Sequence, residues 1–268
     1  MSENKSLLPD VIEPISNAIH QNLPSTERET DGALSTVVGF FNNVVLYPVK
    51  KANLTFRYKL ESFEDDLKER IKHIPPENLQ IPPTMIAGPT LEALRYTYDE
   101  KELRDMYENL LASSMDNRTS AFAHPSYVDT IKQMSPLDAK ILKEISKVGQ
   151  CPAAKVVLTT EEYPNQYIAR ALPELYIPGI SELDDPFLIS QSIINLSRLG
   201  VIDIMPSGLG NFNYKSLLEN EYIVSTKKQY SELEDGIKIE IFEKGIEVND
   251  YGDEFCRICM TEVHYNAD

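Results

Sequence analysis

The fold is decided by IPPTMIAGPTLEALRYTYDEKELRDMYENLLASSMDN, residues 81–117, and by HPSYVDTIKQMSPLDAKILKEI, residues 124–145. These stretches hold three residues of the types that begin helices. Pro89 suits the first position of a helix, where the missing N–H costs nothing. Asp99 is an N-cap with a glutamate three residues later, and Ser135 is an N-cap followed by a proline and then an aspartate at the third position. We therefore predict that helices begin at these three points.

Apolar residues after the second and third start signals recur at helical spacing. They predict one core-facing stripe on each helix: Leu103, Met106, Tyr107, Leu110 and Leu111 on the first, and Ile141, Leu142 and Ile145 on the second. Charged residues, Glu108 among them, occupy the other side of the first helix. We interpret the apolar stripes as protein core rather than as the lining of a cofactor site, and predict no cofactor.

A long charged helix is predicted upstream, over residues 53–74. It carries a narrow apolar stripe made of Leu60, Phe63, Leu67, Ile71 and Ile74. Narrow stripes of this kind favour packing of helices in a bundle or between subunits. Residues 1–32 contain one short apolar helix and a polar, turn-rich linker.

Residues 33–49, ALSTVVGFFNNVVLYPV, form the most apolar window of the chain. A helix that is apolar on most sides is either buried or associated with a membrane. Two asparagines near its middle and Pro48 at its end favour burial. Phe40 and Phe41 are the residues here that we expect to contact lipid or a second subunit if the segment is instead exposed.

The rest of the chain mixes helix and strand signals. We predict helices over residues 166–172, 186–199 and 214–226, strands over 155–159 and 201–205, and a hairpin over 237–249 that turns at 243–245. Gly200 suits the C-terminal cap of the second of these helices. Two helices, a two-stranded ribbon and a closing helix are together typical of a winged-helix module. The predicted protein is thus mainly α, with a tail (1–32), an N-terminal helical bundle (33–134) and a winged-helix-like α+β module (135–268).

Charge limits the partners of this chain. There are 26 basic and 42 acidic side chains, a formal net charge of −16. Affinity for nucleic acid comes mainly from basic residues that displace counterions, so nucleic acid is not the expected partner. The helix that would read DNA in a winged helix, residues 186–199, has a single basic residue, Arg198. We expect a protein partner or self-association, with membrane contact as the alternative.

The cysteines and clustered acids predict neither redox nor metal chemistry. Three cysteines without a secretory signal indicate a reduced, cytoplasmic protein. Cys256 and Cys259 form a CxxC, but they lie inside an amphipathic helix and no second ligand pair exists for zinc. The acids Glu247, Asp250, Asp253 and Glu254 do not have the spacing of a calcium loop, so no metal site is predicted.

Arg118 and His124 are the candidates for catalysis. An arginine can stabilise the charge that develops on a phosphate, and a histidine can exchange protons near neutral pH. The spacing of this pair resembles the arginine–histidine pair of HEPN ribonucleases. The structural interpretation, which we favour, is that Arg118 pairs with a nearby carboxylate and His124 helps to begin the helix after Pro125.

The collinear, proline-punctuated order of the two quoted stretches resembles the Abi-alpha family, bacterial proteins linked to abortive infection. The resemblance spans roughly residues 33–268 and is densest over 75–145. It implies a role in defence against phage and brings no agreed catalytic residues. We therefore expect a defence protein that acts through protein contacts without catalysis. A HEPN-like ribonuclease and a membrane-perturbing effector using residues 33–49 are the alternatives.

Overall fold

The computed structural model describes residues 57–163, 166–168, 171–180, 183–233 and 235–261. The chain divides into two compact units. The first comprises Met1–Lys132 and Arg257–Asp268, and the second comprises Gln133–Cys256. The apolar window at residues 33–49, with Phe40 and Phe41, lies outside the described residues.

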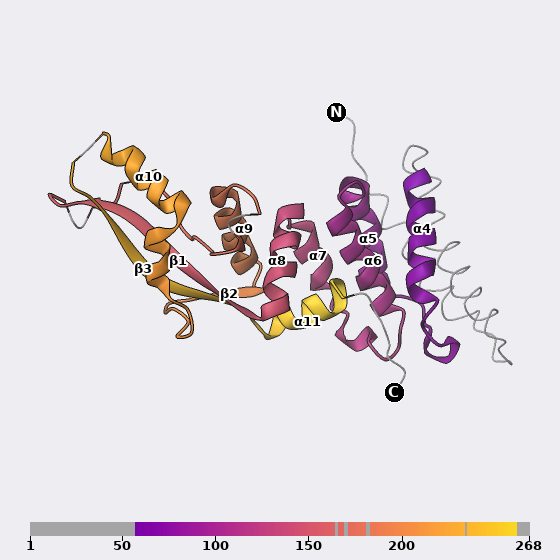
Figure 1. Ribbon diagram of the computed structural model, residues 1–268. Coiled ribbons are helices and arrows are strands. Elements are labelled where there is room, and N and C mark those ends of the chain that lie inside the picture. Colours follow the sequence, from indigo (N-terminus) through magenta and orange to yellow (C-terminus); the bar gives the residue numbers. More distant parts are fainter. Residues whose placement is uncertain (1–56, 164–165, 169–170, 181–182, 234, 262–268) are drawn as a thin grey trace, which may run out of the picture. The chain divides into compact units, whose positions relative to one another are not determined.

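The first unit is a group of helices around α6 (Figure 1). These are α4 (Arg57–Ile71), α5 (Thr84–Thr97), α6 (Lys101–Ser114) and α7 (Ser126–Lys132), with short 3-10 turns at Pro76–Asn78 and Ser120–Phe122. Helix α6 contacts α4, α5 and α7. From Met106 onward every residue of α6 is buried, so its polar side chains must find partners inside the protein.

The apolar stripe predicted for the upstream helix is buried at each described position. Phe63, Leu67 and Ile71 on α4, and Ile74 just beyond it, lie in the core. This face of α4 packs against α6. The stripe therefore does what its spacing predicts, which is to join one helix to another.

Two predicted helix starts in this unit are wrong. Helix α5 begins at Thr84, after the N-cap Pro83, and Pro89 lies inside it. Its ring removes one N–H from the helix, and Pro89 is on the exposed side of α5. Helix α6 begins at Lys101 with Glu100 as its N-cap, and no side chain caps it.

The second unit begins with the helix start that the sequence predicts most fully. Helix α8 (Pro136–Val148) has Ser135 as its N-cap. The Ser135 hydroxyl accepts from the Asp138 N–H at 3.1 Å, and the Asp138 carboxylate accepts from the Ser135 N–H at 2.7 Å. This reciprocal capping box confirms the prediction. Ile141, Leu142 and Ile145 are fully buried, as expected.

Helix α9 (Pro186–Arg198) also begins and ends close to the predicted residues. The Asp185 carboxylate caps it by accepting from the N–H groups of Phe187 and Leu188. After the helix, Gly200 adopts a φ of 75°, a conformation that favours glycine. Helix α9 packs on α8.

The sheet has three antiparallel strands in the order β1-β3-β2. They are β1 (Gln150–Thr160), β2 (Ile202–Met205) and β3 (Ile237–Val248). Strands β1 and β3 pair from Gln150↔Glu247 to Thr160↔Ile237, while β2 pairs only with the end of β3. The predicted hairpin over 237–249 is therefore wrong, because β3 is one continuous strand.

Gly245 explains the error. It stands opposite Met205 inside the sheet, not in a turn. A Cβ at this position would lie 2.4 Å from Met205 Cε and 3.2 Å from a Leu209 methyl. Glycine within a strand marks a close approach of neighbouring atoms, and here the approaching groups are these two side chains.

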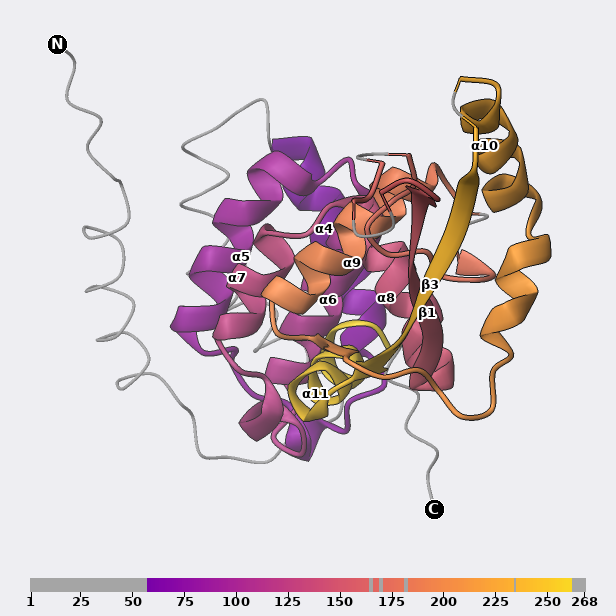
Figure 2. The ribbon, with the colours of Figure 1, turned by 90° about the vertical axis from the view of Figure 1, so that its left-hand side faces the viewer.

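One face of the long β1–β3 ribbon is covered by a 3-10 helix, η5 (Tyr214–Glu219), and by α10 (Glu221–Ser231) (Figure 2). Tyr214, Leu217 and Ile223 pack there against strand residues such as Val156 and Ile237. The helix predicted over 214–226 is thus two elements. The helix predicted over 166–172 is wrong where that segment is described, since residues 166–168 and 171–172 are not helical.

The last helix, α11 (Asp250–Cys259), begins directly after β3. Taken together the described residues form an α+β protein, helical for the most part with one small antiparallel sheet.

Candidate functional site

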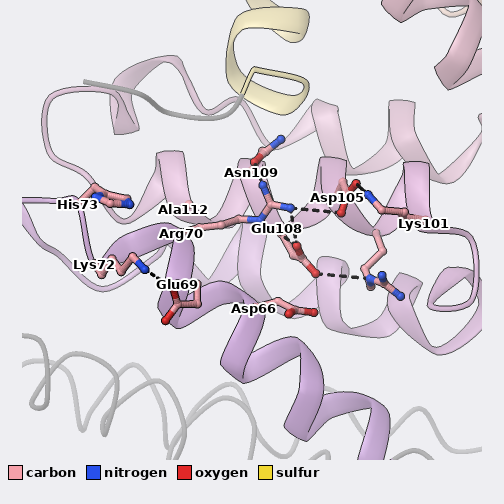
Figure 3. A pocket seen from close by; sticks show the side chains of 11 residues that line it. Asp66, Glu69, Arg70, Lys72, His73, Lys101, Asp105, Glu108, Asn109 and Ala112 are labelled. Carbon is pink, nitrogen blue, oxygen red and sulfur yellow. Dashed lines mark hydrogen bonds and ion pairs between the residues drawn. The ribbon is translucent and has the colours of Figure 1, made fainter. Parts of the chain in front are cut away.

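A cavity of about 410 Å³ opens between α4 and α6 in the first unit (Figure 3). Its walls carry acidic and basic side chains in nearly equal number. They are Asp66, Glu69, Arg70, Lys72, His73, Lys101, Arg104, Asp105, Glu108, Asn109 and Ala112. The size falls within the range of about 300–1,000 Å³ that is usual for small-molecule sites.

Arg70 makes three hydrogen bonds across this cavity, from α4 to α6. Its guanidinium donates from Nε to Glu108 Oε2 at 2.8 Å and from Nη1 to Asn109 Oδ1 at 2.6 Å. A third bond runs from Nη2 to Asp105 Oδ1 at 3.2 Å. Arg70 therefore links α4 to three residues of α6 through the planar fork that only arginine offers.

Glu108 lies deeper than the sequence predicts. Its side chain is 2% exposed, although its charge placed it on the predicted solvent side of the helix. Burial raises the pKa of the Glu108 carboxyl, and this effect outweighs the lowering caused by the neighbouring Arg70 guanidinium. Arg70 thus offsets only part of the cost of burying this charge.

Two polar atoms at the cavity lack hydrogen bonds within the described part of the chain. Glu108 Oε1 and Arg104 Nε are both buried and have no hydrogen-bond partner. They face each other as an ion pair 3.6 Å apart, which is too long for a hydrogen bond. An unmade bond of this kind costs about 1–3 kcal/mol per group.

Asn109, which lines the cavity, is hydrogen-bonded to the C-terminal end of α11 within the same unit. Its Nδ2 donates to the carbonyl of Cys259 at 3.0 Å, and Ser113 donates to the carbonyl of Ile258 at 3.2 Å. These two bonds satisfy carbonyls at the C-terminal end of α11 that the helix itself leaves open. Sequence reasoning missed this whole group of residues, since their partners are far apart along the chain.

Arg118 and His124 each have a local structural partner. The Arg118 guanidinium donates to Asp116 from Nε at 2.9 and 3.1 Å and from Nη2 at 2.6 Å, and the Asp116 side chain is fully buried. His124 Nδ1 accepts from the Ser126 N–H at 3.1 Å, at the first residue of α7. These contacts are the ones that the structural interpretation of the pair expects.

Comparison with known proteins places the chain in a family. The family model described as abortive infection alpha matches residues 55–259. The chain belongs to the abortive infection alpha family. No curated protein and no solved structure matches it.

The cysteines of this abortive infection alpha protein are buried and free of disulfides. Burial raises the pKa of the Cys151 thiol to about 11, and burial together with Asp253 raises that of Cys256 to about 12. Thiols held protonated in this way are poor nucleophiles. Among the described residues no group of three or more His, Cys, Asp or Glu side chains could hold a metal ion.

No helix within the described ranges is both long and apolar enough to cross a membrane. The binding candidates Phe40 and Phe41 lie outside those ranges, so their role stays a prediction.

Helix α9 has apolar side chains on both its inner and its outer side in the second unit. Ile189, Ile193 and Leu196 are fully buried on its inner side. On the outer side Leu188 and Ile194 are 48% and 40% exposed. Arg198, the only basic residue of α9, donates to Asn195 Oδ1 from Nε and Nη2. Its Nη1 also donates to Gln133 Oε1 at 3.1 Å.

Proposed function

We propose that the protein acts in abortive infection by contacting a protein partner through the outer face of α9, without catalysis. The family of the chain suggests the role in abortive infection. The exposed pair Leu188 and Ile194 carries the proposal for the mode of action. Large apolar side chains that stay exposed on a helix whose inner side is already buried can form part of a surface that a second protein covers.

The order of elements in the second unit supports a winged-helix-like interpretation. A helix (α8) and a strand (β1) are followed by α9 and then by two antiparallel strands, β2 and β3. In such a module α9 stands at the position of the recognition helix. Its outer face is therefore the surface that the proposal assigns to binding.

Electrostatics favours protein over nucleic acid as the partner of this face. Residues 136–268 include 12 basic and 22 acidic side chains, a formal charge of −10. Arg198 is already engaged by Asn195 and Gln133. A surface without other cations gains nothing from the release of counterions by a phosphate backbone.

The test compares three forms of the full chain in phage-challenged cells. They are the wild type, the double variant Leu188→Glu/Ile194→Glu, and the control Val224→Glu, which makes the same kind of substitution once, at an exposed apolar position of α10. Affinity purification should recover the same protein with the wild type and the control, and lose it with the double variant. Recovery of RNA or lipid in its place, or retention of the partner by the double variant, would contradict the proposal.

A further inference from the structure

The cavity between α4 and α6 contains two buried polar atoms without hydrogen-bond partners, and these atoms determine which chemical groups the cavity can bind. Glu108 Oε1 needs a donor and Arg104 Nε needs an acceptor, and the two atoms are 3.6 Å apart. An ammonium group placed between them would meet the positive charge of Arg104. A carboxylate or phosphate oxygen would meet the negative charge of Glu108. A neutral group that both accepts and donates, such as a hydroxyl, suits both, because its oxygen accepts from Nε while its proton is donated to Oε1.

Asp66 supplies a second acceptor on the same cavity. It lies on α4 facing α6, below Glu108 in Figure 3, and its charge acts on the Glu108 carboxyl. Among the described residues no hydrogen bond or ion pair occupies it. The other acids of the cavity wall are paired, Glu69 with Lys72 and Asp105 with Arg70 and Lys101.

We propose that this cavity binds a vicinal diol, the group carried by sugars and by the ribose of nucleotides. One hydroxyl enters between Glu108 Oε1 and Arg104 Nε, and the neighbouring hydroxyl donates to Asp66. Arg104 Nη1 donates to the Tyr98 carbonyl at 3.0 Å, and this bond keeps the guanidinium beside the cavity. The Arg104 side chain is partly exposed and lies over the Tyr98 ring, 4.9 Å from the centroid, so the ligand hydroxyl approaches Nε from the cavity side.

The balance of the remaining charges agrees with a ligand that is neutral where it is bound. The cavity walls carry four acids and four lysines or arginines. A single water could also bridge Glu108 and Arg104. Its share of liquid volume is only about 30 Å³, however, far less than the 410 Å³ of the cavity.

Titration calorimetry on the full chain tests the proposal with four probes: D-glucose, D-ribose, adenosine 5′-monophosphate and 2′-deoxyadenosine 5′-monophosphate. Binding of the sugars without the nucleotides would identify a free sugar as the source of the diol. Binding of the ribonucleotide with marked loss for its deoxy counterpart would identify a ribose. Either result supports the proposal.

Substitutions in the cavity wall test whether a probe that binds does so in this cavity. Asp66→Ala should weaken binding by about tenfold or more, the effect of losing a hydrogen bond to a charged group. Asp65→Ala, at the neighbouring exposed position of α4, is the matched control and should leave binding unchanged. Glu108→Gln should also weaken binding, with circular dichroism confirming that it folds.

The proposal is overturned if none of the four probes gives saturable binding up to about 10 mM. In that case Glu108 Oε1 and Arg104 Nε bind water only. It is equally overturned if binding occurs but survives both Asp66→Ala and Glu108→Gln, since the diol would then lie elsewhere.

Discussion

Replacing Arg70 with alanine should destabilise the first unit more than any surface charge can explain. Arg70 is 22% exposed and its partner Glu108 is 2% exposed. Removing one partner of a buried pair costs about 3–5 kcal/mol, because the other charge stays buried without compensation. Partial exposure of Arg70 reduces this to about 2–4 kcal/mol. For a chain of this size the expected loss is roughly 4–16 °C in Tm.

Thermal unfolding of the full chain, followed by far-ultraviolet circular dichroism, measures the effect. Lys72→Ala is the control, since it removes an exposed pair with Glu69 and should cost at most about 1 kcal/mol. The double variant Arg70→Met/Glu108→Leu should recover part of the lost stability, because the Glu108 charge is no longer buried, while Arg104 loses its ion-pair partner. The reasoning is refuted if Arg70→Ala costs no more than Lys72→Ala, or if the double variant is less stable than Arg70→Met.

Three further predictions concern the second unit. Ser135→Ala removes half of the capping box of α8 and should lower the free energy of unfolding by about 1 kcal/mol in urea titrations, and an unchanged value would contradict the cap. Gly252→Ala should be far more damaging, because its Cβ would lie 1.9 Å from the backbone oxygen of Val201, and soluble expression with a wild-type Tm would refute this. Cys151 and Cys256 should react slowly with a thiol reagent at pH 8–9 in the folded protein and quickly in denaturant. Their pKa values of about 11 and about 12 keep both thiols protonated at pH 8–9, and only the thiolate reacts. Fast labelling of the folded protein would contradict that burial.

The elements that could be predicted are those whose signals are local. The capping box at Ser135 lies within four consecutive residues, and the glycine after α9 acts on the turn beside it. Pro89 misled the prediction because a proline on the exposed side of a helix is tolerated where the lost bond faces water. Gly245 misled it because a glycine before a strand end is typical of a turn, whereas here it makes room for Met205 and Leu209.

The candidate site could not be predicted in the same way. Glu108 stands among charged neighbours at helical spacing, which is the usual pattern of a solvated face. Its burial depends on Arg70, 38 residues away, and on helices that surround α6 from several sides. No short pattern in one sequence records a partner at that distance. The pairing of Arg118 with a carboxylate could be predicted, because its partner Asp116 is only two residues away.

The central claim, that the outer face of α9 acts in abortive infection through protein contact, is tested most directly by phage challenge of cells producing each form of the protein. Survival of the culture at low phage input, with death of the infected cells, is the readout. The account predicts that Val224→Glu protects like the wild type and that Leu188→Glu/Ile194→Glu fails to protect while keeping a wild-type Tm. Full protection by Leu188→Glu/Ile194→Glu would contradict it, and so would loss of protection by His124→Ala at unchanged stability, the result expected of a ribonuclease.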